Sequence, residues 1–233
     1  MTPSRPVYGQ ETIPQLPEDY DVRIRAVIPF YQEMHQETVN LVRMYNGQPT
    51  KWLDTGCGTG SLVAKASLIF PETEFILADP SEGMLALAQK KLQRRQNVRF
   101  LSPATTQSLE GIEDASLDVV TAIQCHHYQG AEMRIEAVAR CFELLKEGGI
   151  FVVSENIRPF TEVGIEVGKR YLAQFQRGYG RKEEEIASYL SRFDREYFPI
   201  TVQEHLDLLR AQGFRRVEML WYSYMQAAFY AIK

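Results

Sequence analysis

The chain has 233 residues, 45% of them hydrophobic and 24% charged, which is enough to build one elaborated globular domain with a sizeable core. The net charge is −4, and Lys and Arg are scattered, so nucleic acid is an unlikely main partner, although it is not excluded. No apolar run approaches the roughly 18 residues that span a bilayer, and no signal peptide is visible, so we expect a cytoplasmic protein without membrane contact. Three cysteines without metal-ligand spacing predict neither a disulfide framework nor a metal site.

The first 45 residues are predicted to be an arm followed by a helical lid. Residues 1–18 carry four prolines and little periodicity. From residue 20 to about residue 46 the apolar spacing is helical, and Pro29 should interrupt the helix because it lacks the N–H that a helix interior needs.

Strands and helices alternate through the next segment, residues 46–156. Strands are predicted over 51–54, 74–79, 98–101, 117–124 and 149–155, and helices over 61–70, 81–95 and 131–146. This alternation predicts an α/β fold with a parallel sheet covered on both faces.

The C-terminal part, residues 201–233, completes the same core. A capping box formed by Thr201 and Glu204 starts a predicted helix over 202–212, and two strands follow over 215–222 and 224–232. Their link is too short for a parallel crossover, so these two strands must pair antiparallel.

Residues 157–200 interrupt the alternation with a long, largely helical insertion that is rich in aromatic residues. Ligands of an α/β sheet bind beyond the carboxyl ends of the strands, where this insertion begins. We therefore expect it to act as a cap over the site or to form the contact of a homodimer.

The stretch 52-WLDTGCGTG-60 contains the first chemical motif. Gly56, Gly58 and Gly60 let the backbone turn sharply from strand to helix and let a ligand approach the N–H groups. The helix that follows offers free N–H donors near Thr59 and Gly60. The third glycine comes one residue sooner than in a dinucleotide fingerprint, and Asp54 suits a ligand with an ammonium group.

Asp79, at the end of the second predicted strand, is the second chemical feature. A carboxylate there can accept both hydrogen bonds of a ribose diol. Together with the glycine loop it predicts an adenosyl ligand with an amino-acid tail. The competing interpretation is a tight strand–helix turn that has an acidic cap and no ligand.

The sequence resembles the class I S-adenosylmethionine-dependent methyltransferases over about residues 45–233. The resemblance rests on DTGCGTG, ADPSEGML, TAIQCHHY and GGIFVVSEN. It implies a Rossmann-like sheet of seven strands in the order 3-2-1-4-5-7-6, with the last strand antiparallel. It also implies S-adenosylmethionine as cofactor and S-adenosylhomocysteine as product.

The resemblance further implies roles for individual residues. The three glycines would line the methionine moiety, Asp79 would hold the ribose, Pro80 and Met84 would flank the adenine, and Gln124 would lie under the sulfonium. The family often has an acid after the third strand that reads the adenine amino group. Here Ala104 and Thr105 take its place, so that contact should come from backbone or from the Thr105 hydroxyl.

Within the superfamily, several segments look like the carboxy-S-adenosylmethionine synthases and their plain methyltransferase relatives. These are 20-YDVRIRAVIP-29, 154-SEN-156, the insertion and the ending 221-WYSYMQAAFYAIK-233. The synthases use an arginine of the insertion to hold the extra carboxylate of their cofactor. An ungapped alignment places Leu190 there, with Arg192 nearby but out of register, which favours ordinary S-adenosylmethionine.

Four residues are candidates for the catalytic step. His126 follows the fourth strand and can act as a base near pH 7, although a packed, hydrogen-bonded histidine is about as compatible. Tyr20 and Tyr31 lie on helices that can close over the cofactor. Glu155 can orient an acceptor amine, but a structural carboxylate at a strand end fits equally well. Arg25 can hold a cofactor or substrate carboxylate, or can simply be exposed.

The sequence therefore predicts a methyltransferase that acts on a small-molecule acceptor by in-line displacement. The alternatives are a carboxy-S-adenosylmethionine synthase-like enzyme of tRNA modification, a non-catalytic cofactor-binding scaffold and, more weakly, an NAD dehydrogenase. The acceptor itself does not follow from these residues, because substrate pockets vary freely on one scaffold.

Overall fold

The computed structural model describes residues 17–233, so the predicted arm lies outside the described residues except for its last two positions. The strands are β1 (Lys51–Thr55), β2 (Glu74–Ala78), β3 (Val98–Phe100), β4 (Leu117–Ile123), β5 (Leu145–Asn156), β6 (Arg216–Ser223) and β7 (Gln226–Ile232). The α-helices are α1 (Pro17–Arg25), α2 (Tyr31–Tyr45), α3 (Ser61–Ile69), α4 (Glu82–Leu92), α5 (Ala131–Leu144), α6 (Glu162–Gly178), α7 (Glu183–Ser191) and α8 (Val202–Ala211). Two 3-10 turns complete the described elements, η1 (Thr106–Ser108) and η2 (His126–Tyr128).

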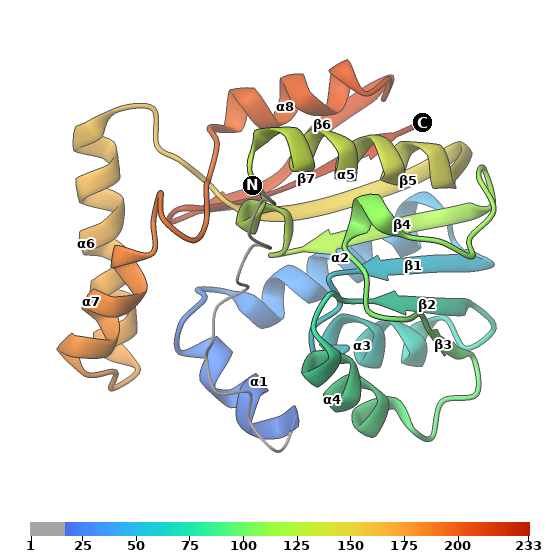
Figure 1. The fold of residues 1–233 in the computed structure, drawn as a ribbon, viewed down its shortest axis with the longest axis horizontal. Helices are drawn as coiled ribbons and strands as arrows, with labels where there is room; N and C mark the ends of the chain where they lie inside the picture. Colours follow the sequence, from blue (N-terminus) through green and yellow to red (C-terminus); the bar gives the residue numbers. More distant parts are fainter. Residues whose placement is uncertain (1–16) are drawn as a thin grey trace, which may run out of the picture.

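All seven strands form one sheet in the order β3-β2-β1-β4-β5-β7-β6, as the sequence predicts (Figure 1). Strands β1 to β5 pair parallel, whereas β7 pairs antiparallel with both β5 and β6. The carboxyl ends of β1, β2 and β4 point to the same edge, where α1 and the α6–α7 pair also lie (Figure 1).

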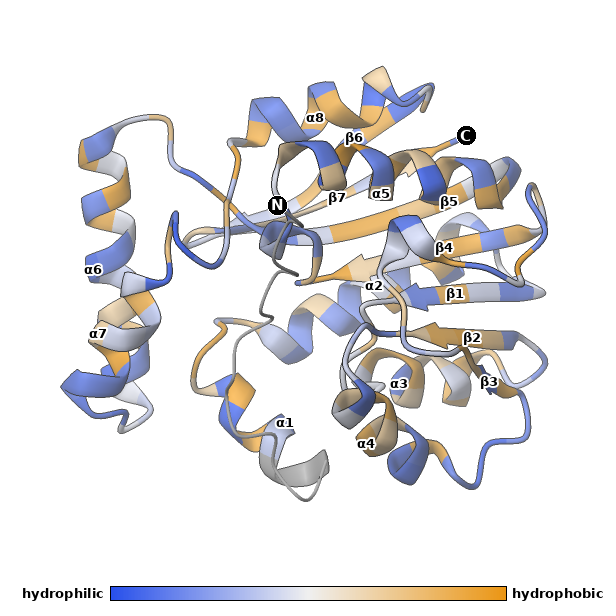
Figure 2. Ribbon diagram, in the orientation of Figure 1, coloured by the Kyte–Doolittle hydropathy of each residue, from blue (hydrophilic) through white to orange (hydrophobic). Residues whose placement is uncertain are grey.

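Helices cover both faces of the sheet, and the central parallel strands β1, β2, β4 and β5 place apolar side chains on each face. One face packs against α2, α3 and α4 through a cluster that contains Val39, Val63 and Ala88. The other face packs against α5 and α8 through a cluster that contains Val138 and Leu209. Figure 2 shows the resulting pattern, with mostly apolar central strands and helices that alternate between polar and apolar positions.

The N-terminal segment and the insertion lie at the carboxyl edge of the sheet. The predicted break near Pro29 is confirmed, because α1 ends at Arg25 and Phe30 has a left-handed φ of 56° before α2 begins. The insertion forms α6 and α7, which stand side by side at the left of Figure 1. Helix α6 exposes the apolar side chains of Val163, Val167 and Tyr171.

One predicted boundary is wrong. The sequence places a helix over 131–146 and the fifth strand over 149–155, but α5 ends at Leu144 and β5 begins at Leu145. Leu145 pairs with Leu117, and the register shifts before Ile150 pairs with Val119. Pairing with β4 thus places Leu145 and Lys146 in a strand, although their apolar spacing continues that of the preceding helix.

Candidate functional site

The turn between β1 and α3 contains three glycines in left-handed backbone, with φ of 67° at Gly56, 53° at Gly58 and 72° at Gly60. Their surroundings differ. A Cβ on Gly56 would lie 2.4 Å from the Cβ of Cys125, and one on Gly60 would lie 2.9 Å from a methyl carbon of Leu92. A Cβ on Gly58 would meet nothing within 4 Å. Gly56 is therefore required for packing, and at Gly60 a side chain would displace the end of Leu92. Gly58 instead leaves open space next to bare backbone, which fits a ligand approach.

Asp79 follows β2 directly and faces this turn. Its carboxylate accepts the N–H of Gly58 at 2.9 Å and the N–H of Ser81 at 2.9 Å. Burial raises the pKa of this carboxyl group, and the two backbone hydrogen bonds act in the opposite direction. Asp79 thus joins the end of β2 to the glycine turn, with half-exposed Pro80 beside it.

Two further adenine-site candidates surround Asp79. Met84 lies in the first turn of α4, and its N–H is capped by the Ser81 hydroxyl at 3.3 Å. Ala104 donates its N–H to the backbone oxygen of Asp79 at 3.3 Å, so the loop after β3 also reaches this place. The Thr105 hydroxyl, however, lies 2.9 Å from the Ser108 hydroxyl within its own loop.

Asp54, the acid before the glycines, is only 2% exposed. Its Oδ1 accepts a hydrogen bond from the Thr121 hydroxyl at 2.7 Å on the neighbouring strand β4. Burial raises the pKa of Asp54 to about 7; the Thr121 hydrogen bond opposes this shift, and the nearby charge of Asp79 adds to it. Below that pH the free protein holds a proton at Asp54, and a cationic ligand would displace it.

We expect S-adenosylhomocysteine to release protons on binding in the acidic range. If its ammonium group lies beside Asp54, it lowers the pKa of that group from about 7 by ~1–3 units, as an opposite charge does. Binding at pH 6 then releases about half a proton or more per site, and the affinity increases as the pH rises toward 7. Calorimetry in two buffers of different ionisation enthalpy measures this release. Asp54→Asn should abolish it, and equal release by both proteins would contradict the assignment.

Helix α1 is joined to the glycine turn and α4 by a half-buried ion pair that sequence analysis missed. The Lys91 ammonium lies 2.6 Å from the Asp21 carboxylate, and the two side chains are 13% and 19% exposed. The hydroxyls of Thr59 and Ser61 donate to Asp21 at 2.8 and 3.0 Å. No local signal could have revealed this pair, since its members are 70 residues apart in the chain.

Of the lid residues, Tyr31 lies closest to this cluster. Its pKa is raised, first by burial and then by the charge of Asp21, while a hydrogen bond with Ser61 acts in the opposite direction. Tyr20 is half-buried on α1, next to Asp21. Arg25 is exposed, and its guanidinium donates to the side-chain oxygen of Gln32 at 2.8 Å. The structure therefore brings Tyr31 to the glycine turn and leaves Arg25 at the surface.

Gln124 ends β4 with a left-handed φ of 57°. Its amide nitrogen donates to the Ser154 hydroxyl at 3.3 Å, and its Oε1 is buried without a hydrogen-bond partner. An unpaired buried carbonyl costs free energy and can accept a hydrogen bond from a bound molecule. A role of Gln124 under the sulfonium stays a prediction.

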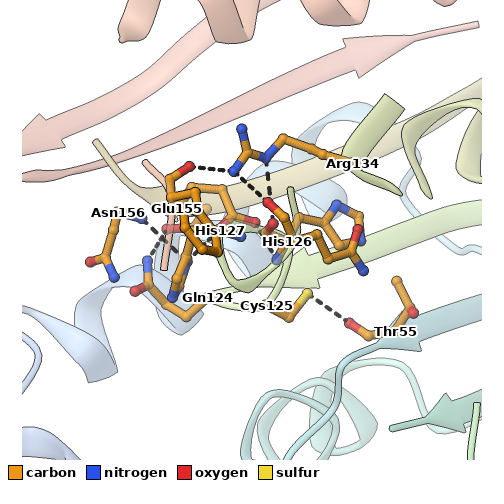
Figure 3. A network of polar contacts seen from close by, with 11 residues as sticks. Thr55, Gln124, Cys125, His126, His127, Arg134, Glu155 and Asn156 are labelled. Atoms are coloured by element: carbon orange, nitrogen blue, oxygen red, sulfur yellow. Dashed lines mark hydrogen bonds and ion pairs between the residues drawn. The ribbon is translucent and has the colours of Figure 1, made fainter. Parts of the chain in front are cut away.

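Glu155 forms the centre of a buried network on the opposite face of the sheet (Figure 3). Its carboxylate accepts the backbone N–H of His126 at 3.0 Å, the backbone N–H of His127 at 2.9 Å and the Nδ1 of His127 at 2.5 Å. Burial alone would raise the pKa of Glu155, but the interaction with His127 lowers it to about 2. Both oxygens accept N–H groups of the η2 turn, so the geometry supports a structural role for Glu155. A role toward an acceptor amine stays a prediction.

His126 is also buried on this face. Its Nε2 lies 2.9 Å from the Thr106 hydroxyl, and burial lowers its pKa to about 4. Its ring contacts Phe151, which belongs to the core under α5 and α8, whereas Tyr31 and Asp54 lie on the α2 side. The catalytic candidates are thus divided between two faces. A role of His126 as base stays a prediction.

The same network ties the insertion to the core, through residues that sequence analysis did not single out. Arg134, only 3% exposed, donates to the backbone oxygens of Phe198 and Gln129. Phe198 in turn donates its N–H to the backbone oxygen of His127 at 2.7 Å. The end of the insertion is therefore fixed to the turn after β4.

Residues 17–233 contain no group of three side chains that could hold a metal ion. Within that range, no helix is both long and apolar enough to cross a membrane.

Residues 53–151 match a family model described as a methyltransferase domain. Among curated proteins, the chain is 23% identical over 219 residues to the carboxy-S-adenosyl-L-methionine synthase of Nautilia profundicola, covering 92% of this chain and 90% of that one. It is 27% identical over 204 residues to the synthase of Campylobacter concisus, covering 85% and 84%. The resemblance predicted from the motifs is confirmed.

Solved structures share the fold. The 1,6-didemethyltoxoflavin-N1-methyltransferase of Burkholderia thailandensis, crystallised with S-adenosylhomocysteine, has a TM-score of 0.61 at 18% identity, with 96% of this chain and 92% of that one covered. An O-methyltransferase family protein of the same organism has a TM-score of 0.62 at 15% identity, with 92% of this chain but only 57% of that one covered.

Proposed function

We propose that this chain is an S-adenosylmethionine-dependent methyltransferase and that it transfers a methyl group to a small-molecule acceptor; the matching methyltransferase domain supports this proposal. The methyltransferase domain match supports the predicted enzyme, and the S-adenosylhomocysteine bound to a structural neighbour supports the predicted cofactor. The observation that carries the proposal is the open glycine turn at Gly58 next to two buried carboxyl groups, Asp54 and Asp79, at the carboxyl ends of adjacent strands.

We assign the parts of the cofactor to the residues around this turn. Asp54 faces the ammonium group, the backbone of Gly58 and Thr59 faces the methionine tail, and Asp79 accepts the ribose hydroxyls. The cofactor supplies an electrophilic methyl group, and the chain contributes alignment and exclusion of water. Pro80 and Met84 lie where they can flank the adenine.

A small acceptor is supported by the cover over this site. The Asp21–Lys91 ion pair fastens α1 over the glycine turn, so a bulky nucleic acid cannot reach the turn from that side. The net charge of −4 also disfavours a polyanion.

The test uses two acceptor pools and methyl-labelled S-adenosylmethionine. We expect the purified chain to transfer label into a low-molecular-mass cell extract and not into total tRNA. A calorimetric titration with S-adenosylhomocysteine, run in parallel, reports cofactor binding alone. Label in tRNA only would overturn the small-molecule proposal, and binding without transfer to either pool would favour the non-catalytic scaffold.

The second candidate function is that of the synthases to which the chain is similar. This function requires a cation that binds the extra carboxylate of the cofactor. In the alignment, Arg192 is close to Leu190, the position that corresponds to the arginine of the synthases. The guanidinium of Arg192 already pairs with Glu196 at 2.7 Å and lies over the ring of Tyr128 at 5.9 Å, which supports the plain cofactor. The mass of the co-purified cofactor separates the two, because the carboxylated form is heavier by one carboxylate.

A homodimer through the insertion and a cytoplasmic location stay predictions. The exposed side chains of Val163, Val167 and Tyr171 on α6 support the dimer, since they form one apolar stripe at helical spacing. A monomer mass in sedimentation equilibrium would contradict it.

A further inference from the structure

A row of polar side chains crosses the α2 face of the sheet at its carboxyl edge. On β5, Ser154 and Asn156 continue the alternation of Ile150 and Val152, which pack in the core under α2. Asn156 pairs with Gln226 on β7, and Gln226 pairs with Ser223 on β6. Paired residues of antiparallel strands present their side chains on the same face. The row therefore leads from Gln124, which donates to Ser154, to the far edge of the sheet.

Several atoms along this row are buried without a partner. Gln226 is only 2% exposed, and neither its Oε1 nor its Nε2 forms a hydrogen bond. The Oε1 of Gln124 and the indole Nε1 of Trp221 are also buried without a hydrogen-bond partner. Each such atom costs about 1–3 kcal/mol when it is left unpaired. Two donors and two acceptors on one face therefore indicate a ligand that complements them.

A cavity of about 260 Å³ lies at the outer end of the row, between α2 and β6. It is lined by Phe30, Glu33, Met34, Glu37, Trp221 and Ser223. Trp221 and Ser223 pair with Ala228 and Gln226, so the row forms the continuation of the cavity toward the cofactor turn. The volume suits a molecule of one or two rings.

The charges of the lining decide the ligand class. Its charged members are Glu33 and Glu37, one turn apart on α2, and both are exposed. Two carboxylates at the opening repel an anion, while the unpaired groups deeper in are neutral amides and an indole. Phe30 and Trp221 offer aromatic surface for a flat ring.

We infer that this row and cavity form the acceptor site, and that the acceptor is an uncharged, planar nitrogen heterocycle with ring N–H and carbonyl groups. The inference rests on the proposed methyltransferase function and narrows its substrate class. Transfer to a ring nitrogen forms the methyl–nitrogen bond and breaks the methyl–sulfur bond, whose electron pair stays on sulfur. The ring proton passes to solvent.

The test compares four two-ring probes on the full chain saturated with S-adenosylhomocysteine. Lumazine and quinazoline-2,4-dione represent the neutral heterocycle, 2-naphthoate the anion and 2-(aminomethyl)naphthalene the cation. We expect at least one of the two neutral probes to bind in calorimetry at least tenfold more tightly than either charged probe. Equal or tighter binding of a charged probe, or no heat from both neutral probes, would overturn the inference.

A variant pair ties this binding to the row. Gln226→Leu removes the two unpaired atoms at nearly constant volume and should weaken the neutral probe at least tenfold. Because those atoms cost free energy in the free protein, urea unfolding should show equal or higher stability, and the affinity for S-adenosylhomocysteine should stay unchanged. Gln203→Leu makes the same change on α8, across the sheet, and should leave all three measurements unchanged. Unchanged probe affinity in Gln226→Leu would overturn the site. Since cofactor binding is measured separately, loss of the cofactor site and loss of the acceptor site give different results.

Discussion

Replacing Glu155 with glutamine is expected to lower the free energy of unfolding by about 2–5 kcal/mol, because buried donors that lose their acceptor cost ~1–3 kcal/mol each. The side chain is 0% exposed, and its carboxylate accepts two backbone N–H groups and the His127 ring. A glutamine NH₂ would face these donors without an acceptor. Urea unfolding measures the loss. Glu162→Gln, an exposed change on α6, should stay within about 0.5 kcal/mol of the parent, and a similarly small loss for Glu155→Gln would contradict the role of this network.

The pH dependence of stability gives the same network a second readout. The pKa of Glu155 is about 2 in the folded chain and 4.5 as its ordinary value. The folded state thus binds the proton less tightly than the unfolded one, so the contribution is complete above about pH 4.5 and is lost as the pH falls toward 2. We expect Glu155→Gln to lose stability less steeply in this window than the parent does.

Asp79→Ala should weaken S-adenosylhomocysteine binding about 10- to 150-fold, which corresponds to ~1.5–3 kcal/mol for hydrogen bonds to a charged group. The carboxylate positions the N–H of Gly58 and, in the proposed complex, accepts the ribose hydroxyls. Calorimetry measures the affinity. Glu82→Ala removes the same charge three residues later, at an exposed position, and should leave binding unchanged. An affinity in Asp79→Ala equal to that of the parent would refute the ribose assignment.

Local sequence was sufficient wherever one short segment determines its own conformation. The alternation of strands with amphipathic helices predicted the parallel sheet, and the short link before β7 required the antiparallel pair. The glycine turn was predicted because glycine adopts the sharp strand-to-helix turn readily and leaves the backbone N–H groups accessible to a ligand. Even there the sequence did not reveal the packing partners. A side chain at Gly56 would collide with Cys125, which follows β4, the strand that pairs with β1.

Boundaries and partners required the tertiary structure. The start of β5 at Leu145 follows from pairing with β4, which overrides the helical spacing of the preceding residues. Glu155 and Ser154 are neighbours in sequence, yet a strand presents them on opposite faces, one to the η2 turn and the other to Gln124. The sequence motif shows that these residues are polar but not which face receives each of them.

The sequence by itself predicted the alternating strands and helices, the glycine turn and an adenosyl ligand, because these depend on local periodicity and on residues of adjacent βα units; the strand order came from the family resemblance. Only the tertiary structure revealed the Asp21–Lys91 ion pair, the burial of Glu155 and the polar row that includes Gln226. Each of these joins segments far apart in the chain, and contacts of that kind form only when the whole sheet and its helices have packed.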